Sequence, residues 1–546
     1  FYLTARGTTR TAAENALAIL RDTEPELHLR SVTLTAKDKI CLCETRECTP
    51  EACPYANGYY ARIKGALWDV LDVPCLTAET LQEYAERHTV CPFELGLDSS
   101  LWSDVIIGDY NYLFDPVVHL VRFFESAGDY IFLVDEAHNL PGRAREMHSA
   151  ALTKTSFYEA KKLLGKGKSS LKNALTKVND VFIEWRHRAE EETAARDGRF
   201  GKTFFLKERS EEFDHLLNRL CEPLEAWLDD HREPDETHTA LLQLYFDVRA
   251  WLRVADTFDD HFVLQITASG SEVRAAQLCL DPSAFLADSF ALGRAAVLFS
   301  ATLAPASYYK DLCGVPEARA VALRSPFPAG NQGLFCIGNV STRYKDRDAS
   351  LAIVEESLAT MVRAHCGNYL AFFPSYAYME QAYAQFKEHC PEINCIKQEN
   401  AMDEQQKAAF LAQFVPGPSQ PLLGFAVMGG VFGEGVDLTG DRLIGVGIVG
   451  PGLPQVGPRQ EQLRDYFEQT RGSGFDYAYR YPGMNKVLQA AGRVIRTPRD
   501  KGVVLLIDNR FAMPDYRRLM PPHWSHLKMI YDTEKLEREL WRFWEE

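Results

Sequence analysis

The chain has 546 residues, which is too long for a single hydrophobic core and predicts three or four structural units. Its composition, 46% hydrophobic and 25% charged, excludes a disordered chain, and no apolar run approaches the roughly 20 residues that a bilayer span needs. A net charge of −16 gives no general attraction for nucleic acid, so any such binding must come from a local basic channel.

The first residues, FYLTARGTTRTAAENALAIL, predict a short strand, a polar turn and an amphipathic helix. Thr4 and Arg6 offer a hydroxyl and a charge to a phosphate backbone, although such units usually carry only packing residues. Because the sequence has no initiator Met and starts inside a predicted strand, we expect its N-terminus to be truncated.

Thirteen cysteines, an odd number, favour a reducing compartment and a metal site over a disulfide framework. Three close thiols and a distant fourth are enough for four-coordinate binding of zinc or of an iron–sulfur cluster. The lack of paired C-x₂-C knuckles favours the cluster, and ordinary buried cysteines are the alternative. The expected ligands are Cys41, Cys48, Cys53 and Cys91, with Cys43 and Cys75 as possible substitutes.

Two predicted strands end on polar side chains. Residues 105–107 are followed by Tyr110, whose ring could stack on a base or simply pack in the core. The apolar run YIFLV ends on Asp135 and Glu136, with His138 close behind. A buried strand that delivers acids at its carboxyl end predicts a magnesium ligand in Asp135 and a base for the attacking water in Glu136. The alternative is a surface strand end with solvated acids.

Residues 151–260 are rich in Lys, Glu, Leu and Ala and predict a largely helical region. Gly167-Lys168-Ser169 and Gly201-Lys202-Thr203 resemble the end of a P-loop. However, the first Gly of G-x-x-x-x-G-K-[ST] is replaced by Lys162 or Arg196, and no buried strand leads into either tripeptide. Neither is therefore expected to bind phosphate.

The stretch RAAVLFSATLAP predicts another strand, ending on Ser300 and Thr302, whose hydroxyls could link the acids to a nucleic-acid site or merely cap the strand. Beyond about residue 325, strands alternate with helices, which predicts a second parallel sheet. In this part NKVLQAAGRVIR predicts a helix with Gln489, Arg493 and Arg496 on one face. Such arginines suit the charge of a triphosphate, and a solvated basic face is the alternative.

Taken in order, the motifs YLTAR, four cysteines, VDEAHNL, FSATL, FFPSY, GVFGEGVDL and QAAGRVIR resemble those of the XPD/DinG-like iron–sulfur helicases of superfamily 2. The resemblance covers essentially the whole chain. CPFE followed by DYNYLFDP is most similar to bacterial and archaeal members.

The resemblance implies an α/β fold of two RecA-like parallel-sheet motor domains, the first interrupted by an iron–sulfur cluster domain and a helical arch domain. The implied boundaries are 1–35, 101–150 and 266–315 for the first motor domain, 36–100 for the cluster domain, 151–265 for the arch and 316–546 for the second motor domain.

The resemblance also implies an ATP-dependent DNA helicase that moves 5′ to 3′ on single-stranded DNA in repair or replication, with ATP, Mg²⁺ and a 4Fe–4S cluster as cofactors. Single-stranded and forked DNA would be its partners, with no membrane, and we expect a monomer in a prokaryotic cytoplasm, associated with the nucleoid. The implied site residues, beyond those already given their roles, are His138, Ser300 and Thr302 for coupling, and Glu434, Gly435 and Asp437 at the nucleotide.

The family's P-loop is the one missing motif, since it would lie upstream of FYLT. Without its backbone amides and Lys, triphosphate binding is expected to be severely weakened, so the chain as given is expected to be inactive. Two alternatives remain. One is a non-catalytic nucleic-acid-binding relative without an ATP site, and the other is a motor whose four thiols hold structural zinc.

Overall fold

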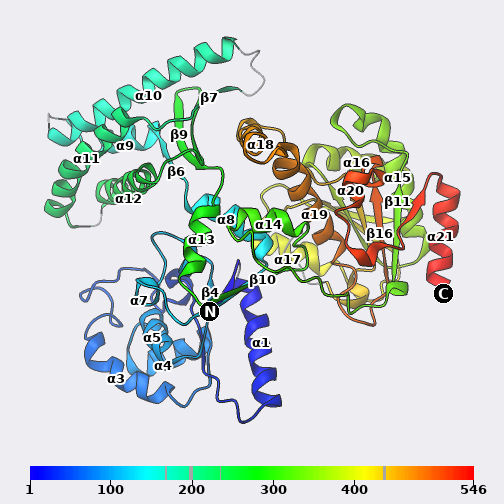
Figure 1. Cartoon of the computed structure of the whole chain (residues 1–546), viewed down its shortest axis with the longest axis horizontal. Helices are drawn as coiled ribbons and strands as arrows, with labels where there is room; N and C mark the ends of the chain where they lie inside the picture. The colour runs from blue at the N-terminus through cyan, green and yellow to red at the C-terminus, as the bar shows by residue number, and fades with distance from the viewer. Residues whose placement is uncertain (6, 167–168, 196–200, 234, 434–437, 546) are drawn as a thin grey trace. The chain divides into compact units, whose positions relative to one another are not determined.

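The computed structural model describes residues 1–5, 7–166, 169–195, 201–233, 235–433 and 438–545 (Figure 1). The chain forms two compact units. The first contains Phe1–Ser300 and Lys310–Pro316, and the second contains Ala301–Tyr309 and Glu317–Glu546. None of the described helices is long and apolar enough to cross a membrane.

The first unit is built on a six-stranded sheet in the order β10-β5-β1-β4-β2-β3, in which every strand pair is parallel. Its strands are β1 (Tyr2–Thr4), β2 (Ser31–Thr33), β3 (Cys75–Leu76), β4 (Val105–Asp109), β5 (Ile131–Asp135) and β10 (Ala295–Phe299). The helices of this sheet are α1 (Gly7–Thr23), α6 (Asn111–Phe114), α7 (Val121–Phe124), α8 (Leu140–Met147) and α13 (Ser283–Ala291). The carboxyl ends of β1, β4 and β5 meet at one edge, where ligands bind in open parallel sheets.

Strand β10 forms the outer edge of this sheet and is unusually exposed for an apolar strand. Ala295, Ala296 and Val297 all face solvent, and Val297 is 51% exposed. In the described part of the chain, β10 pairs only with β5. An exposed, uncharged strand edge of this kind is suited to pairing with a further strand.

The cysteine-rich segment forms a small helical layer between β2 and β4. It contains α2 (Lys37–Ile40), α3 (Tyr59–Val70), α4 (Ala78–His88) and α5 (Pro92–Ser99). Tyr59 donates a hydrogen bond of 2.8 Å to Asp98 and so joins α3 to α5. Arg62 donates to the carbonyls of Pro54, at 3.1 Å, and Thr89, at 2.9 Å, and so ties together the two loops that carry Cys53 and Cys91.

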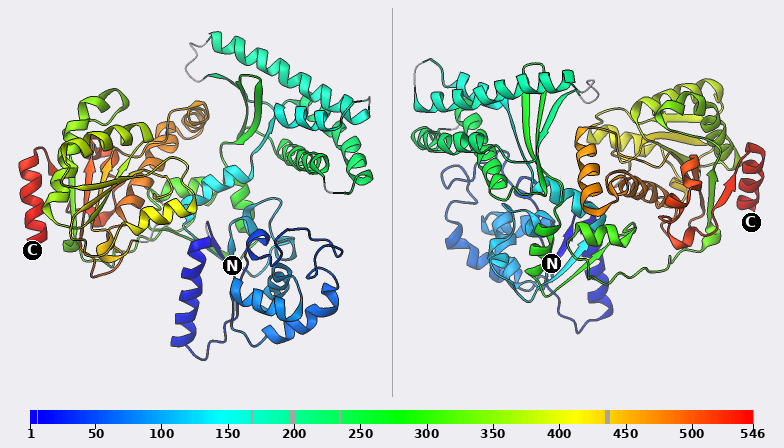
Figure 2. Two further views of the ribbon diagram at one scale, coloured as in Figure 1. Left: turned by 180° about the vertical axis from the view of Figure 1, so that it is seen from behind. Right: turned by 45° about the horizontal axis from the view of Figure 1, so that its top comes forward.

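The region that was expected to be helical from 151 to 265 differs from that expectation in two ways. It contains an antiparallel sheet in the order β6-β9-β8-β7, and this sheet extends to Cys279. Its elements are β6 (Ala150–Thr153), α9 (Lys154–Leu163), α10 (Ser170–Ala195), β7 (Lys202–Leu206), α11 (Glu211–Asp230), α12 (Glu236–Asp256), β8 (Phe262–Ser269) and β9 (Glu272–Cys279). Gly270, at φ +61°, makes the tight turn between β8 and β9. Figure 2 shows these strands lying against the helices of the insertion.

The second unit is built on a seven-stranded parallel sheet in the order β13-β14-β12-β15-β16-β11-β17. Its strands are β11 (Gln332–Ile337), β12 (Asn368–Phe373), β13 (Asn394–Lys397), β14 (Leu422–Val427), β15 (Gly445–Val449), β16 (Gly502–Ile507) and β17 (Lys528–Ile530). Its helices are α15 (Arg347–Ala364), α16 (Tyr376–His389), α17 (Glu404–Ala412), α18 (Pro458–Arg471), α19 (Tyr481–Ala491), α20 (Pro514–Arg517) and α21 (Thr533–Glu545); α14 (Ala306–Leu312) lies in the segment that connects the units.

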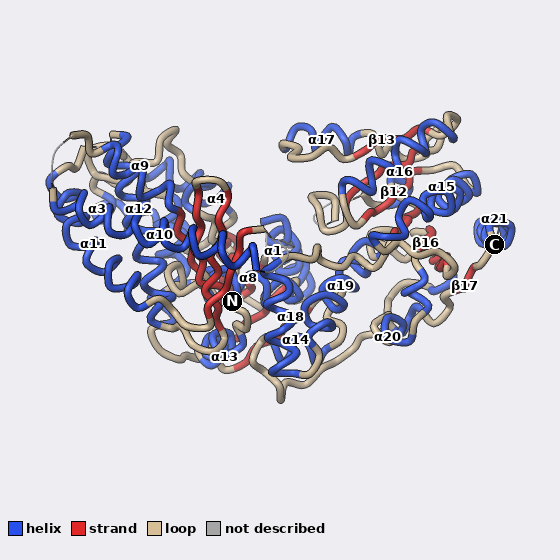
Figure 3. Tube along the Cα trace, turned by 90° about the horizontal axis from the view of Figure 1, so that it is seen from above, coloured by secondary structure: helices blue, strands red, loops and turns tan. Residues whose placement is uncertain are grey.

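Both faces of the second sheet are covered by helices, as Figure 3 shows. Leu370 and Phe372 of β12 pack into the core under α17 and α19, whereas Tyr369, Ala371 and Phe373 pack into the core under α15, α16 and α21. This burial on both faces explains why the strands of this unit are continuous apolar runs.

Candidate functional site

Three hydrogen bonds hold Asp135, the acid at the end of β5. One oxygen of Asp135 accepts the amide of Glu136 at 2.8 Å, and the other accepts the hydroxyl of Tyr2 at 3.0 Å. The hydroxyl of Tyr110 donates to the Asp135 carbonyl. Burial raises the pKa of Asp135, and the Tyr2 hydrogen bond opposes that rise. The carboxylate is therefore held in one orientation at the carboxyl edge of the sheet.

Glu136 has a left-handed backbone, with φ at +50°. A non-glycine residue in this region costs about 1–3 kcal/mol and is most often kept where a function requires it. The hydroxyl of Ser300 donates to Glu136 Oε2 at 3.1 Å, and His138 Nδ1 lies 2.7 Å from Ser300 Oγ and 3.2 Å from Glu136 Oε2. Ser300 follows β10, which pairs with β5 so that Phe299 lies opposite Asp135. The structure thus brings three predicted residues together around one carboxylate.

The other residues predicted to act with these acids are buried or lie outside the described residues. Tyr110 is fully buried, so its ring is not available to stack on a base, and its hydroxyl supports the Asp135 backbone instead. Thr4 is also fully buried and contacts the carbonyl of Gly108 at 3.5 Å. Arg6 lies outside the described residues. Thr302 is buried and belongs to the second compact unit.

Tyr2 is a site residue that sequence reasoning missed. Tyr2 lies two residues before Thr4 and shares its face of the strand, but this spacing does not indicate an acidic partner. Its pairing with β5, with Tyr2 opposite Leu133, is what brings the hydroxyl to Asp135. That pairing joins residues more than a hundred positions apart and is not visible in the local sequence.

Five cysteines line one cavity of about 210 Å³ in the cysteine-rich layer. The four expected ligands are among them, and the fifth is Cys43, while Cys75 lies in β3. The sulfurs of Cys43 and Cys53 are 3.9 Å apart, and burial raises the pKa of Cys43 to about 11. Within the described residues no three potential ligands are placed to hold one metal ion. Thiols around one cavity suit either a zinc ion or an iron–sulfur cluster, because both take four cysteine ligands.

The structure does not form the single basic helix face that was predicted for Gln489, Arg493 and Arg496. Helix α19 ends at Ala491 with Gly492 as its C-cap, so Arg493 and Arg496 do not continue the helix that carries Gln489. Arg493 is buried and donates to the carbonyl of Gly433 at 2.5 Å. This bond joins it to the start of the motif GVFGEGVDL. The amide of Arg496 donates to Asp500 at 2.7 Å. Glu434, Gly435 and Asp437 lie outside the described residues.

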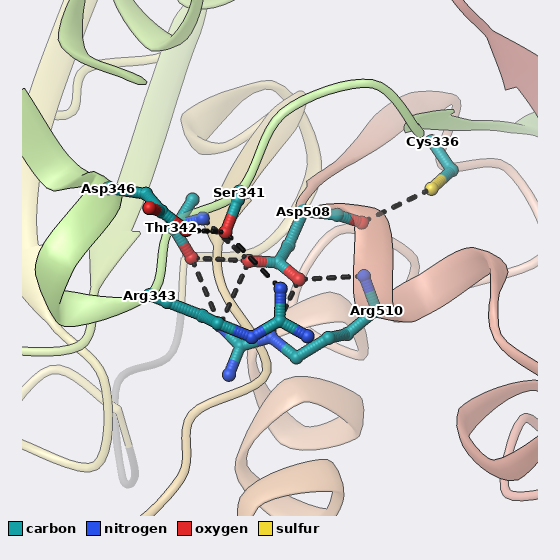
Figure 4. A network of polar contacts seen from close by, with 7 residues as sticks. All are labelled: Cys336, Ser341, Thr342, Arg343, Asp346, Asp508 and Arg510. Atoms are coloured by element: carbon teal, nitrogen blue, oxygen red, sulfur yellow. Dashed lines mark hydrogen bonds and ion pairs between the residues drawn. The ribbon is translucent and has the colours of Figure 1, made fainter. Parts of the chain in front are cut away.

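A second missed group lies at the carboxyl edge of the second sheet, where Asp508 follows β16 (Figure 4). Its fully buried carboxylate accepts five hydrogen bonds of 2.5–3.0 Å, from the amide and hydroxyl of Thr342 and from the amide, Nε and Nη2 of Arg510. Burial alone would raise the pKa of Asp508, but these bonds and the charge of Arg510 outweigh it and lower the pKa.

Two family models match the chain. The DEAD_2 model matches residues 24–157, which include the acids of β5, and the Helicase C-terminal domain model matches residues 358–527. The chain belongs to the XPD-like family of superfamily 2 DNA helicases. Together the two models cover the cysteine-rich layer and most of the second sheet.

Curated relatives agree with this membership. The XPD helicase subunit of the general transcription and DNA repair factor IIH from Schizosaccharomyces pombe is 24% identical over 82% of this chain and 67% of its own length. Regulator of telomere elongation helicase 1 from Rattus norvegicus is 22% identical over 91% of this chain and 45% of its own length. The chain therefore spans about half to two thirds of the length of these two relatives.

Solved structures agree on the fold. A solved XPD helicase has a TM-score of 0.61 at 18% identity, with 97% of this chain and 91% of that chain covered. A solved apo form of XPD has a TM-score of 0.52 at 19% identity, with 79% and 83% covered. The predicted fold class is confirmed: the chain has two RecA-like parallel-sheet domains, and the first is interrupted by insertions.

Proposed function

We propose that this chain is the motor of an ATP-dependent DNA helicase that moves 5′ to 3′ on single-stranded DNA and unwinds duplexes in repair or replication. The observation that carries the proposal is the group formed by Glu136, His138 and Ser300 at the carboxyl edge of a parallel sheet. Membership of a DNA helicase family supports the same substrate class.

Asp135 and Glu136 divide the chemistry of ATP hydrolysis between them. The Asp135 carboxylate, fixed by Tyr2 and the Glu136 amide, is suited to Mg²⁺, which would neutralise charge on the phosphates. Glu136 orients a water molecule and takes its proton as the water oxygen bonds to the γ-phosphorus. The bond from that phosphorus to the ADP oxygen breaks, and the electron pair leaves with ADP.

Ser300 couples ATP hydrolysis at Glu136 to the second unit. Its hydroxyl donates a hydrogen bond to the Glu136 carboxylate. That bond changes when Glu136 takes up a proton or moves. The next residues, 301–309, cluster with the second unit, and they include Thr302. A change at Glu136 is therefore passed along the chain by one hydrogen bond and a short covalent segment. In the second unit, Gln489, Arg493 and Arg496, together with Glu434, Gly435 and Asp437, are proposed to face the phosphates.

A 4Fe–4S cluster is the proposed occupant of the thiol-lined cavity, with Cys41, Cys48, Cys53 and Cys91 as its ligands. The five thiols that line the cavity and the size of the cavity support this assignment. Such a cluster would join two segments of chain, the loop that carries Cys41, Cys48 and Cys53 and the turn that carries Cys91. Arg62 already ties these two segments together through the carbonyls of Pro54 and Thr89.

The proposed protein acts as a monomer on single-stranded and forked DNA in a prokaryotic cytoplasm, associated with the nucleoid. The test is strand separation by the protein expressed from its complete gene. Forked duplexes with only a 5′ tail or only a 3′ tail are compared with and without ATP. We expect ATP-dependent unwinding of the 5′-tailed substrate. Binding that is indifferent to ATP, with no unwinding, would instead identify a non-catalytic helicase relative.

A further inference from the structure

Tyr308 ties the start of α14 to the second unit. Residues Ala301–Tyr309 cluster with that unit, whereas Lys310–Pro316 cluster with the first, so the division of the chain falls inside α14. Tyr308 is buried, and its ring centroid lies 5.1 Å from that of Tyr477 and 5.1 Å from that of Tyr481, edge-on to both. The centroids of Tyr477 and Tyr481 are 5.7 Å apart, so the three rings form one group, the tyrosine cluster.

The partners of Tyr308 lie on an irregular turn of helix. Residues Asp476–Arg480 form a π-helical turn, and α19 continues directly from it, beginning at Tyr481. Turns of this kind are rare inside α-helices and are frequently found at functional sites. Tyr477 lies in the first part of the turn and Tyr481 follows its last residue. The tyrosine cluster therefore holds the π-helical turn near both of its ends.

Ion pairs attach the same turn to α20. Arg480 pairs with Asp476 at 2.6 Å and with Asp515 of α20 at 3.2 Å, and Arg518 pairs with Asp476 at 3.3 Å. The Arg480 guanidinium also lies over the ring of Tyr516, at 5.3 Å, and Tyr516 belongs to the core of the second sheet. The π-helical turn is thus held by the core of the second unit and by the segment that carries the tyrosine of α14.

Helix α19 extends from the tyrosine cluster to Gln489, one of the residues proposed to face the phosphates. Tyr481 is the first residue of α19, and Gln489 lies about 12 Å further along the same helix axis, at 1.5 Å per residue. Because a helix is a rigid element over this length, a shift of the π-helical turn moves Gln489 with it. The tyrosine cluster therefore lies where a change in the segment after β10 can reach the second unit's part of the site.

We propose that Tyr308 is a positioning residue that passes a change at Ser300 to the π-helical turn and, through Tyr481 and α19, to Gln489. This inference rests on the proposed helicase function and deepens it, because it names the contact by which the segment after Ser300 acts on the second unit. Tyr308 acts through the packing of its ring against two other rings. A phenylalanine at this position should therefore keep the function, and an aliphatic side chain should lose it.

The test is the coupling ratio, the rate of unwinding of a 5′-tailed fork divided by the rate of ATP hydrolysis, in the protein expressed from its complete gene. Tyr308→Leu keeps a buried apolar side chain but removes two aromatic pairs, each worth a factor of about 2–12, so unwinding should fall roughly tenfold while hydrolysis falls less. Affinity for oligo-dT should be kept. Tyr308→Phe should keep the coupling ratio. Tyr481→Leu removes one of the two pairs from the other side and should lower the ratio as well, so the test does not depend on the folding of one variant.

A double-mutant cycle with Ser300→Ala separates transmission from packing. If both residues act on one path, Ser300→Ala and Tyr308→Leu together should lower the coupling ratio no further than the larger single loss, whereas independent defects would multiply.

Tyr383→Leu is the matched control, because Tyr383 is a half-buried tyrosine of α16 whose ring lies edge-on to Phe425 at 5.4 Å. It should lower the melting temperature and keep the coupling ratio. An unchanged ratio in Tyr308→Leu, losses that multiply in the double variant, a loss in Tyr308→Phe, or an equal loss in Tyr383→Leu would each overturn this inference and leave the helicase proposal standing. No ATP hydrolysis by the unaltered protein would contradict the helicase proposal itself.

Discussion

Asp508→Asn is expected to destabilise the second unit strongly, although it changes one atom of a residue outside the ATP-handling set. The substitution removes the charge that Arg510 faces and places an amide among five donors. Breaking a buried, hydrogen-bonded charge pair from one side costs about 3–5 kcal/mol. For a unit of this size, about 2–4 °C are lost per kcal/mol, so its melting temperature should fall by about 6–20 °C.

The assay is thermal unfolding of the whole chain, followed by calorimetry and by circular dichroism. Asp515→Asn is the control, because Asp515 is exposed and lies 3.2 Å from Arg480, and its loss should cost less than about 1 kcal/mol. A Tm for Asp508→Asn within 2 °C of the unaltered protein would refute the reasoning.

The same carboxylate predicts a dependence on pH. Since the pKa of Asp508 is lowered in the folded state, its contribution is complete above the unfolded pKa of about 3.9 and is lost as the pH falls through the lower folded value. Asp508→Asn has no such contribution to lose. The stability difference between the two proteins should therefore shrink as the pH falls below about 4.

Three further predictions concern the first unit. Tyr2→Phe removes the hydrogen bond that opposes the raised pKa of Asp135, so the acid limb of the pH profile for ATP hydrolysis should move to higher pH. Ser300→Ala removes a hydrogen bond to a charged group worth about 1.5–3 kcal/mol, so unwinding should fall roughly tenfold or more while ATP hydrolysis falls less. Cys53→Ser should abolish bound iron and the visible absorbance of the purified protein, whereas Cys75→Ser, outside the cavity, should retain both.

Each of these has a contradicting result. An acid limb that stays in place in Tyr2→Phe would show that the tyrosine does not set the ionisation of the magnesium ligand. Equal losses of unwinding and hydrolysis in Ser300→Ala would remove the serine from the coupling path. Full iron content in Cys53→Ser would remove Cys53 from the ligand set, and zinc in its place would identify a structural zinc site.

The parts of the site that sequence predicted are those with a strong local signal. The acids Asp135 and Glu136 follow an apolar strand directly, and Ser300 follows another, so two parallel strands were enough to bring them to one edge. Tyr2 and Asp508 gave no comparable signal, because their roles depend on pairing between strands far apart in the sequence.

The errors in predicted elements have equally local causes. Strands β8 and β9, of eight residues each, come after the helices α10, α11 and α12, so their alternation was hidden at the end of a region with helical composition. The sequence predicted that helix α19 continues past Ala491, because Gln489, Arg493 and Arg496 have helical spacing. In the structure the helix ends at Gly492, which lies inside that pattern. Tyr110 follows a strand like a surface aromatic, and only the tertiary fold buries it.

Glu136 is proposed to be the base of an ATP-driven motor, and ATP hydrolysis measured with and without single-stranded DNA tests this role. Glu136→Gln is compared with Glu146→Gln, an exposed carboxylate on α8 that lies 3.7 Å from Arg143, in the protein expressed from its complete gene. We predict that Glu136→Gln lowers DNA-stimulated turnover by about 10²–10⁴-fold while DNA affinity is kept, and that Glu146→Gln changes neither. Undiminished hydrolysis in Glu136→Gln would contradict the account.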